Sequence, residues 1–346
     1  MRHQFARLID HGHDGDASAW PPRYVERGGE LVTRQPFDAR DVSLYVFVLR
    51  ADRLLLELWC EQTFERPSAG IMRYVPIGGN VLLVLANIGE LRSSGPPDDR
   101  LGRVSEQELG VWVPVFDRWR GRAAWTLPYM FVDEPAVSAG GREIYGFPKQ
   151  LAEVSVPAVD QDPTQFEVQA HCIDRFTPDA WIRKHLVVRA RRPGVGPLAR
   201  DWPDLRSAII NLLGGGAAVG AGLGRLQADL VARRAGVAAE LEPALLFLCQ
   251  LALGRVPVVL LKEFRDAADP RFACYQAIIE APQTMLAFRG GGLLSGGWVV
   301  EIADLDGEPL VRELGLKAGP SNPGLAFWLD IDFRIERGRT LWEARP

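Results

Sequence analysis

Short runs of β-branched and aromatic residues, separated by glycine and proline, fill most of the first half of the chain. Runs of this kind are typical of β-strands. No long helical pattern alternates with them, which argues against a doubly wound parallel sheet and favours an antiparallel barrel or sandwich. We expect strands at Ser43–Leu49, Leu54–Leu58, Val81–Ile88, Gly110–Phe116, Tyr129–Val132, Phe166–Cys172 and Leu186–Arg189.

A helical pattern then takes over between Pro193 and Pro257, where alanine, leucine and glycine dominate. Leu223–Leu253 has apolar residues at helical spacing, interrupted by Pro243. Gly214–Gly224 predicts a break between two helices, because each interior glycine costs a helix about 1 kcal/mol relative to alanine. Leu241–Leu253 is almost continuously apolar, so we expect it to be buried rather than to form a mobile lid, and we favour a subunit contact.

Strand patterns resume after this segment, at Val256–Phe264, Cys274–Ile279, Trp298–Ile302 and Leu325–Arg334. We therefore predict one mainly β domain of the α+β class over residues 25–346, with an N-terminal arm at 1–24 and a helical insert at about 193–257. Gly214–Gly224 and Gly290–Gly292 lack the G-K-[ST] and G-x-G-x-x-G patterns of phosphate loops. We interpret the first as a linker or a helix-packing segment and the second as a loop before the strand at Trp298.

Composition and charge exclude several classes of protein. Of the 346 residues, 47% are apolar and 24% charged, as in ordinary folded chains. The net charge of -4 argues against binding to nucleic acid or to a membrane surface. No apolar run approaches the roughly 18 residues of a membrane span, and the polar segment Met1–Asp16 is no signal peptide, so we expect a cytoplasmic protein. The histidines form no metal-binding pattern, and the cysteines lie far apart, at Cys60, Cys172, Cys249 and Cys274.

Only four of the 40 basic residues are lysines, so the chain offers few titratable amines. If Ile144–Lys149 is extended, Tyr145, Phe147 and Lys149 share one face. The two rings would then keep the Lys149 amine away from water. Desolvation disfavours the ammonium form and leaves an amine that can attack a carbonyl. The alternative is that the lysine stem covers aromatic surface while its charged end reaches solvent.

The pattern Gly141-Arg142-Glu143-x-x-Gly-Phe-Pro-Lys149 resembles the motif of the acetoacetate decarboxylase family. Val132–Ala136, Leu261–Asp266 and Ala273–Ala277 are similar to further family segments, so the resemblance runs from about residue 30 to the C-terminus. It implies an antiparallel conical β-barrel with flanking helices, a homo-oligomer, and Lys149 as the lysine that forms a Schiff base with the substrate. It requires no metal, nucleotide or organic cofactor.

The resemblance also implies partners for this lysine. An acid–base glutamate maps to Glu106 or Glu108, of which Glu108 has the better spacing. An arginine that holds the substrate carboxylate maps near Arg40. From the sequence itself, Gln276, Ile278 and Glu280 share one face of a predicted strand, which either lines a polar lumen or meets water. We take Lys149, Glu108 and Glu280 as candidate catalytic residues, and as candidate substrate-binding residues Arg40, Arg142, Tyr145, Gln150 and Gln276.

Two features complicate this assignment. Where the decarboxylase has a second lysine, this chain has Gln150, which supplies no neighbouring positive charge. We therefore expect weak acetoacetate decarboxylation relative to aldol or dehydration chemistry, and a faster decarboxylation in Gln150→Lys. Lys262 is a rival nucleophile, because it follows the apolar run Val258–Leu261.

The sequence thus predicts a Schiff-base-forming lyase that decarboxylates a small β-keto acid. One alternative is an aldolase or dehydratase that acts on a 2-oxo acid through the same lysine. Another is a barrel that binds or hydrolyses a ligand without an iminium. A third is a non-catalytic binding module whose helical insert recruits a partner.

Overall fold

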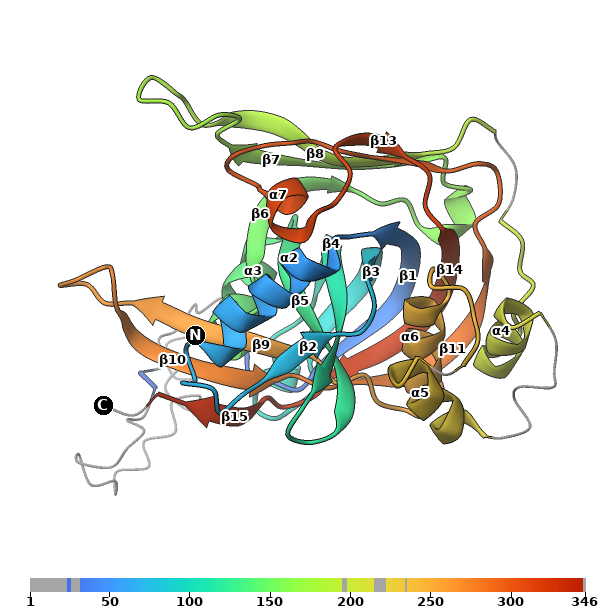
Figure 1. Cartoon of the computed structure of the whole chain (residues 1–346), viewed down its shortest axis with the longest axis horizontal. Coiled ribbons are helices and arrows are strands. Elements are labelled where there is room, and N and C mark those ends of the chain that lie inside the picture. Colours follow the sequence, from blue (N-terminus) through green and yellow to red (C-terminus); the bar gives the residue numbers. More distant parts are fainter. Residues whose placement is uncertain (1–23, 26–31, 195–197, 215–221, 234, 345–346) are drawn as a thin grey trace, which may run out of the picture.

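The computed structural model describes residues 24–25, 32–194, 198–214, 222–233 and 235–344. Most of the predicted N-terminal arm and residues 215–221 of the predicted glycine break lie outside these ranges. The fold is mainly β, as predicted, with a few short helices (Figure 1). No helix in the described ranges has the length and apolar character to span a membrane.

A large curved sheet forms the body of the molecule (Figure 1). Its neighbouring strands are antiparallel except for one parallel pair, so the purely antiparallel expectation is wrong at that place. The strands follow in the order β11 (Gln283–Leu293), β14 (Leu325–Ile335), β1 (Phe37–Arg50), β3 (Asn80–Ser93), β4 (Val104–Asp117), β5 (Arg122–Val132), β6 (Lys149–Ser155), β7 (Gln165–Cys172), β8 (Arg183–Arg191), β12 (Val299–Ile302) and β13 (Gly319–Ser321), with β2 (Tyr74–Pro76) beside β4.

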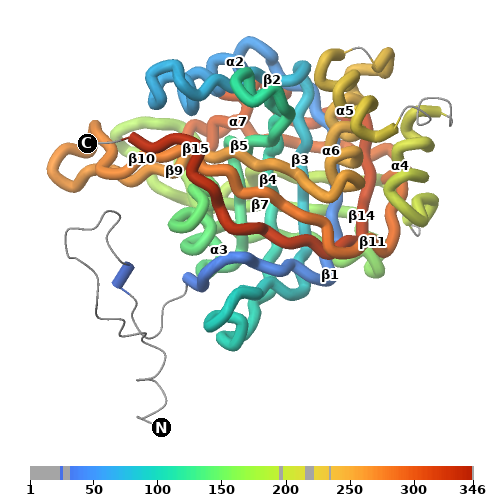
Figure 2. Tube along the Cα trace, turned by 90° about the horizontal axis from the view of Figure 1, so that it is seen from below, coloured from blue at the N-terminus to red at the C-terminus, as the bar shows by residue number. Residues whose placement is uncertain are grey.

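A second sheet and several helices cover the large sheet. The second sheet has the order β15 (Arg339–Glu343), β10 (Ala273–Glu280) and β9 (Val259–Arg265). The α-helices are α2 (Arg53–Cys60), α3 (Pro135–Gly140), α4 (Leu205–Leu212), α5 (Leu223–Val231), α6 (Glu242–Ala252) and α7 (Leu310–Leu314). The remaining turns are η1 (Glu61–Glu65), η2 (Asp98–Arg100), η3 (Gly141–Tyr145) and η4 (Val159–Gln161). Figures 1 and 2 both place α4, α5 and α6 at one flank, beside β11 and β14.

The central strands are buried on both faces, which explains their continuous apolar runs. On β1, Leu44 and Val46 belong to a core that includes the residues of α4–α6. Tyr45 and Phe47 belong to a second core, which includes residues of α2 and α7. We call these two sides of the sheet the α6 face and the α7 face.

Two local predictions are wrong. Leu54–Leu58 is helical, because Asp52 caps the first turn of α2 by accepting a hydrogen bond from the Leu54 N–H at 2.8 Å. Gly290–Gly292 is part of β11 rather than a loop. Glycine is required there for close packing, since a Cβ at Gly291 would lie 2.8 Å from the Trp328 carbonyl oxygen.

The helical insert belongs to the core of the chain itself. The helix expected before the glycine break forms as α4, whereas the longer helix expected after it is divided into α5 and α6, with Pro243 in the first turn of α6, where proline is tolerated. Every residue from Pro243 to Leu251 is buried within this single chain. The expected burial is therefore confirmed, since the chain's own core covers this apolar surface, and the contact of the insert with another subunit stays a prediction.

Candidate active site

Lys149 is the first residue of β6, at the parallel pairing of β6 with β5. Because parallel neighbours need a crossover, α3 and η3 carry the chain back from Val132 to Lys149. The Lys149 side chain is 5% exposed and points towards the α6 face, since its neighbour Met130 packs in that core. The crossover therefore delivers a buried amine to the sheet interior.

The two motif glycines have separate steric roles. A Cβ at Gly141 would lie 2.7 Å from Cδ of Lys149, so this glycine leaves room for the lysine stem. Gly146 has φ +82°, and a Cβ there would lie 2.6 Å from Cα of Lys262. Gly146 therefore ends η3 in a left-handed turn that packs closely against β9.

The residues before Lys149 are not extended, in contrast to the prediction, because Gly141–Tyr145 forms a π-helical turn. The predicted aromatic surroundings nevertheless arise. Lys149 Nζ lies 5.9 Å from the ring centre of Phe147, and the Phe147 ring meets Tyr145 edge to face at 5.7 Å. Tyr145 donates its hydroxyl proton to the Glu336 carbonyl at 2.8 Å, so its polar end fixes the fold.

Two carboxylates from β4 meet the lysine. Lys149 Nζ donates a hydrogen bond to Glu106 Oε1 at 3.4 Å and lies 3.8 Å from Glu108 Oε2. Glu106 and Glu108 project to the same face because they are two residues apart on one strand. The sequence left these two glutamates as alternatives, and the structure brings both to the amine.

The environment of Glu108 favours its protonated form. Burial raises the pKa of Glu108 well above its usual range, and the neighbouring Glu106 carboxylate raises it further. The buried Oε2 of Glu106 has no hydrogen-bond partner among the described residues. The site therefore combines an amine, a group suited to donate a proton and a carboxylate with a free oxygen.

Of the two candidate residues nearest to Lys149 in the motif, Arg142 contacts the lysine backbone and Gln150 points away from the lysine side chain. Arg142 Nη1 donates to the Lys149 carbonyl oxygen at 3.0 Å, which places its guanidinium beside the lysine backbone. Gln150 projects to the opposite face of β6, where its Nε2 donates to Glu308 Oε2 at 3.1 Å. Gln150 therefore does not share the lysine's surroundings, contrary to its assignment as a substrate-binding residue.

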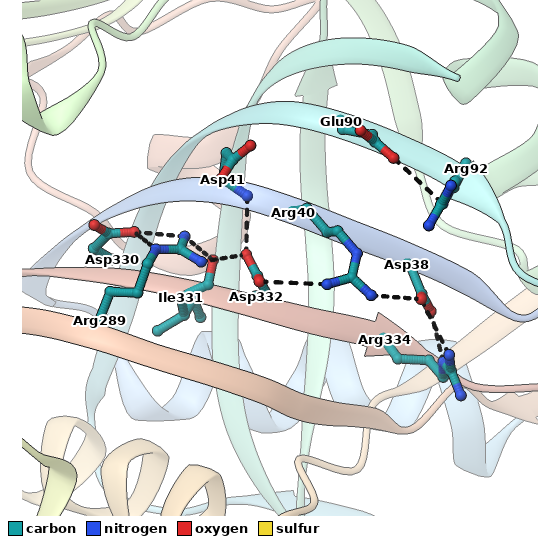
Figure 3. A network of polar contacts seen from close by, with 10 residues as sticks. All are labelled: Asp38, Arg40, Asp41, Glu90, Arg92, Arg289, Asp330, Ile331, Asp332 and Arg334. Atoms are coloured by element: carbon teal, nitrogen blue, oxygen red, sulfur yellow. Dashed lines mark hydrogen bonds and ion pairs between the residues drawn. The ribbon is translucent and has the colours of Figure 1, made fainter. Parts of the chain in front are cut away.

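Arg40 lies in a separate network on the outer side of β1 and β14 (Figure 3). Its guanidinium is 3.4 Å from Asp38 and 3.7 Å from Asp332. The neighbouring Ala39 and Val42 both pack in the α6-face core, because a bulge interrupts the strand between them. This bulge turns Arg40 away from Lys149, and its assignment to the substrate carboxylate is corrected.

Glu280 and Gln276 also lie apart from Lys149. Glu280 is fully buried and accepts hydrogen bonds from Arg122, from Arg255 at 2.8 Å and from Arg339 at 2.7 Å. Although burial alone would raise it, the hydrogen bonds from Arg122 and Arg339 lower the pKa of Glu280. Gln276 donates to the exposed Glu263 at 2.9 Å. The structure therefore does not bring either residue to the amine.

The rival lysine occupies a different environment. Lys262 Nζ lies 5.3 Å from the ring centre of Tyr275 and 3.5 Å from the Ile144 carbonyl oxygen. Burial lowers its pKa. Glu143 and Glu343 have the opposite, smaller effect on this pKa, and among the described residues neither forms an ion pair with Lys262, whereas two carboxylates do so with Lys149.

Sequence reasoning missed two acidic residues, one beside the Lys149 site and one on the opposite face of β6. Asp133 adds to the negative field at Glu108 and accepts a hydrogen bond from the Gln107 N–H at 2.7 Å. Glu308 lies behind Gln150, where burial raises its pKa to about 6. Asp133 lies in the family-like segment Val132–Ala136 and so offered a signal, whereas nothing in the sequence around Glu308 indicates its position.

The chain matches a known protein family over the segment that contains this site. The family model described as acetoacetate decarboxylase matches residues 79–177, a segment that contains Glu106, Glu108, Arg142 and Lys149. No curated protein sequence matches the chain. The resemblance to the acetoacetate decarboxylase family is thus confirmed by a match that spans the complete site.

Solved structures share the fold over nearly the whole chain. Acetoacetate decarboxylase from Legionella pneumophila has a TM-score of 0.56 at 16% identity, covering 94% of this chain and 93% of its own. An acetoacetate decarboxylase-like enzyme from Sphingomonas wittichii RW1 has 0.54 at 11%, covering 91% and 96%. The enduracididine biosynthesis enzyme MppR, complexed with pyruvate, has 0.53 at 14%, covering 91% and 93%. At these identities the likeness establishes an acetoacetate decarboxylase-like fold.

Proposed function

We propose that this protein is a Schiff-base-forming lyase that acts on a small keto acid. The observation that carries the proposal is the buried Lys149 amine within 4 Å of two carboxylate groups, Glu106 at 3.4 Å and Glu108 at 3.8 Å. The family match and the likeness to acetoacetate decarboxylase and to pyruvate-bound MppR support it.

Iminium formation uses the three residues in turn. Lys149 Nζ attacks the keto carbon, and the carbonyl oxygen takes a proton from Glu108 as the π bond breaks. Glu106, whose Oε2 is free of other hydrogen bonds, accepts a proton from Nζ. Loss of the carbinolamine hydroxyl as water then requires a proton, and the proton that Glu106 took from Nζ passes to Glu108, which donates it to the leaving oxygen.

The iminium acts as an electron sink for bond cleavage. In a β-keto acid the carbon–carbon bond to the carboxylate breaks, its electron pair moves to the nitrogen, and CO2 leaves. The enamine takes a proton at carbon, and water hydrolyses the new iminium to release the ketone and the Lys149 amine. Arg142, beside the lysine backbone, is the candidate to hold the substrate carboxylate before cleavage.

The position of Gln150 removes the reason for ranking decarboxylation behind aldol chemistry. A lysine at this position would face Glu308 across the sheet rather than Lys149. An aldolase or dehydratase acting on a 2-oxo acid remains the second candidate, favoured by the likeness to MppR, whose structure holds pyruvate. In that reaction Glu106 takes a proton from the carbon next to the iminium, the resulting enamine attacks an aldehyde, and the new alkoxide takes a proton from Glu108.

Borohydride trapping tests the proposal. The protein is incubated with acetoacetate or pyruvate and sodium borohydride, digested, and analysed by mass spectrometry. We expect ligand mass on the peptide containing Lys149, none in Lys149→Ala, and an unchanged result in the surface variant Lys184→Ala. Absence of any adduct would refute the iminium, and an adduct confined to Lys262 would refute the assigned site.

A further inference from the structure

Trp112 lies on β4 on the same face as the two site carboxylates. Glu106, Glu108, Gly110 and Trp112 alternate along one strand and therefore project to one side. Trp112 is 6% exposed and packs in the α6-face core. This row places the indole next to the site, with only Gly110 between Trp112 and Glu108.

The indole folds back over that glycine. A Cβ at Gly110 would lie 2.9 Å from Trp112 Nε1 and 3.3 Å from Leu127 Cδ2. The N–H edge of the ring therefore occupies the space that a side chain at position 110 would fill. The donor is displaced from its own backbone towards Glu108.

The register of β4, β5 and β6 places Gly110, over which the indole N–H lies, level with Lys149 across the sheet. Gly110 pairs with Met130 on β5, and Met130 pairs with Lys149 on β6. With strands about 4.8 Å apart, the backbones of Gly110 and Lys149 are about 10 Å apart. The Lys149 side chain spans part of that distance, because its Nζ reaches the β4 carboxylates.

Trp112 is held firmly while its N–H is left without a partner. Its ring meets Trp125 edge to face at 6.1 Å and Phe247 of α6 at 5.9 Å. The Trp125 N–H donates to Gln250 Oε1 at 2.6 Å. In the part of the chain that the structure describes, no acceptor receives the Trp112 N–H. Unlike the buried, unpaired Nε1 of Trp298, the Trp112 Nε1 is reachable by solvent, so it can donate to a bound molecule.

We propose that the Trp112 N–H binds a second oxygen function of the substrate, at the end remote from the reacting carbonyl. This inference rests on the proposed function, because it assumes that the keto carbon lies at Lys149. It assigns the substrate to the extended oxo acids that carry an additional carboxylate, carbonyl or hydroxyl oxygen. Phe247 contacts the Trp112 ring, so the helical insert fixes one wall of the site.

The test compares two acids of equal length, 2-oxoglutarate and 2-oxopentanoate, which differ by a terminal carboxylate in place of a methyl group. The concentration that gives half-maximal borohydride trapping is measured for each acid. In Trp112→Phe we expect it to rise about tenfold for 2-oxoglutarate, the scale of one hydrogen bond to a charged acceptor, and less than twofold for 2-oxopentanoate. Trp119→Phe, at a site that is 67% exposed, is the matched control.

Gly110→Ala provides a second variant, because a Cβ there would displace the indole N–H, and the same selective loss is expected. Equal effects on both acids, or none, would overturn the proposal. Calorimetric binding of both acids to Lys149→Ala, alone and with Trp112→Phe, needs no covalent step. Suppose that Lys149→Ala binds 2-oxoglutarate more tightly than 2-oxopentanoate, that Trp112→Phe abolishes this preference, and that the wild type forms no adduct. That result would refute the Schiff base and support the role of Trp112.

Discussion

Gln150 donates a hydrogen bond to Glu308 at 3.1 Å, on the opposite side of β6 from Lys149. Adjacent residues of a strand point to opposite faces, so neighbours in sequence are separated here by the thickness of the sheet. The side chain at position 150 therefore contacts the buried Glu308. A charge placed there is separated from the Lys149 side chain by the backbone of the sheet.

Gln150→Lys tests this separation. We expect the new ammonium to pair with Glu308 and to leave the rate of acetoacetate decarboxylation within about twofold of wild type, as for a side chain that touches no reacting group. CO2 release measured from pH 5 to pH 8 gives the comparison. A large acceleration near neutral pH would restore the expectation drawn from the sequence.

Glu108→Gln removes the proton donor but keeps its shape. Since general acid–base residues contribute about 100- to 10,000-fold, we expect kcat to fall by at least 100-fold. The wild-type rate should decrease as pH rises through the Glu108 pKa, because burial holds that pKa above its usual range and only the protonated carboxyl can donate. Stopped-flow trapping across pH measures this alkaline limb, and Glu153→Gln, on an exposed side chain, should match wild type.

Gly141→Ala tests the space around the lysine stem. The new Cβ would lie 2.7 Å from Lys149 Cδ, so we expect the amine to be displaced and the trapping rate to fall at least tenfold. Gly140→Ala is the matched control, because it adds the same group one residue earlier, where the nearest atom is Val32 Cγ1 at 3.9 Å. Comparable rates in the two variants would contradict this role.

Glu308→Gln should change how stability depends on pH. Burial raises the Glu308 pKa to about 6, so the folded state holds this proton more tightly than the unfolded chain. The wild type is then fully stabilised below about pH 4.5 and loses about 1 kcal/mol as pH rises through 6, allowing for solvent screening. Urea unfolding at pH 5 and pH 7 should show that, between these two pH values, the free energy of unfolding of the variant rises relative to that of the wild type by this amount. The exposed Glu61→Gln should show no such gain.

Glu280→Gln should affect stability rather than chemistry. Removing the buried charge leaves three arginines without their shared partner, and we expect a loss of about 2 kcal/mol in the free energy of unfolding. Borohydride trapping per folded molecule should be unchanged, and the exposed Glu263→Gln should behave as wild type in both measurements. Loss of trapping with retained stability would return Glu280 to the catalytic set.

The candidate lysine could be predicted because a local motif encodes it. Gly141, Gly146 and Lys149 act within one crossover, so their spacing in sequence reflects their contacts in space. The pairing of Glu106 with Glu108 follows from strand alternation for the same reason. Periodicity is a good guide on β4, but not before Lys149, where the extended run assumed for Ile144–Lys149 is replaced by the turn at Gly141–Tyr145.

Arg40 and Glu280 could not be placed in this way. Arg40 faces outward because a bulge shifts the register of β1, and no residue pattern marks that bulge. Glu280 meets arginines from three distant segments, a contact that depends on how the second sheet packs. The helix at Arg53–Cys60 was missed because the short apolar run Leu54–Leu58 fits a strand as well as a helix. Only the capping role of Asp52 distinguishes the two.

Phe247 and Trp112 meet edge to face, and this one pair of side chains serves both core packing and the proposed substrate contact. The same rings that border the proposed substrate path also fill the core beneath α6. A change that widens the site there leaves a void in the interior, and a change that narrows it strains the packing. At this wall, exchanges that preserve volume, or that are compensated by changes in the insert, are therefore the ones that alter the proposed substrate contact at the least cost in stability.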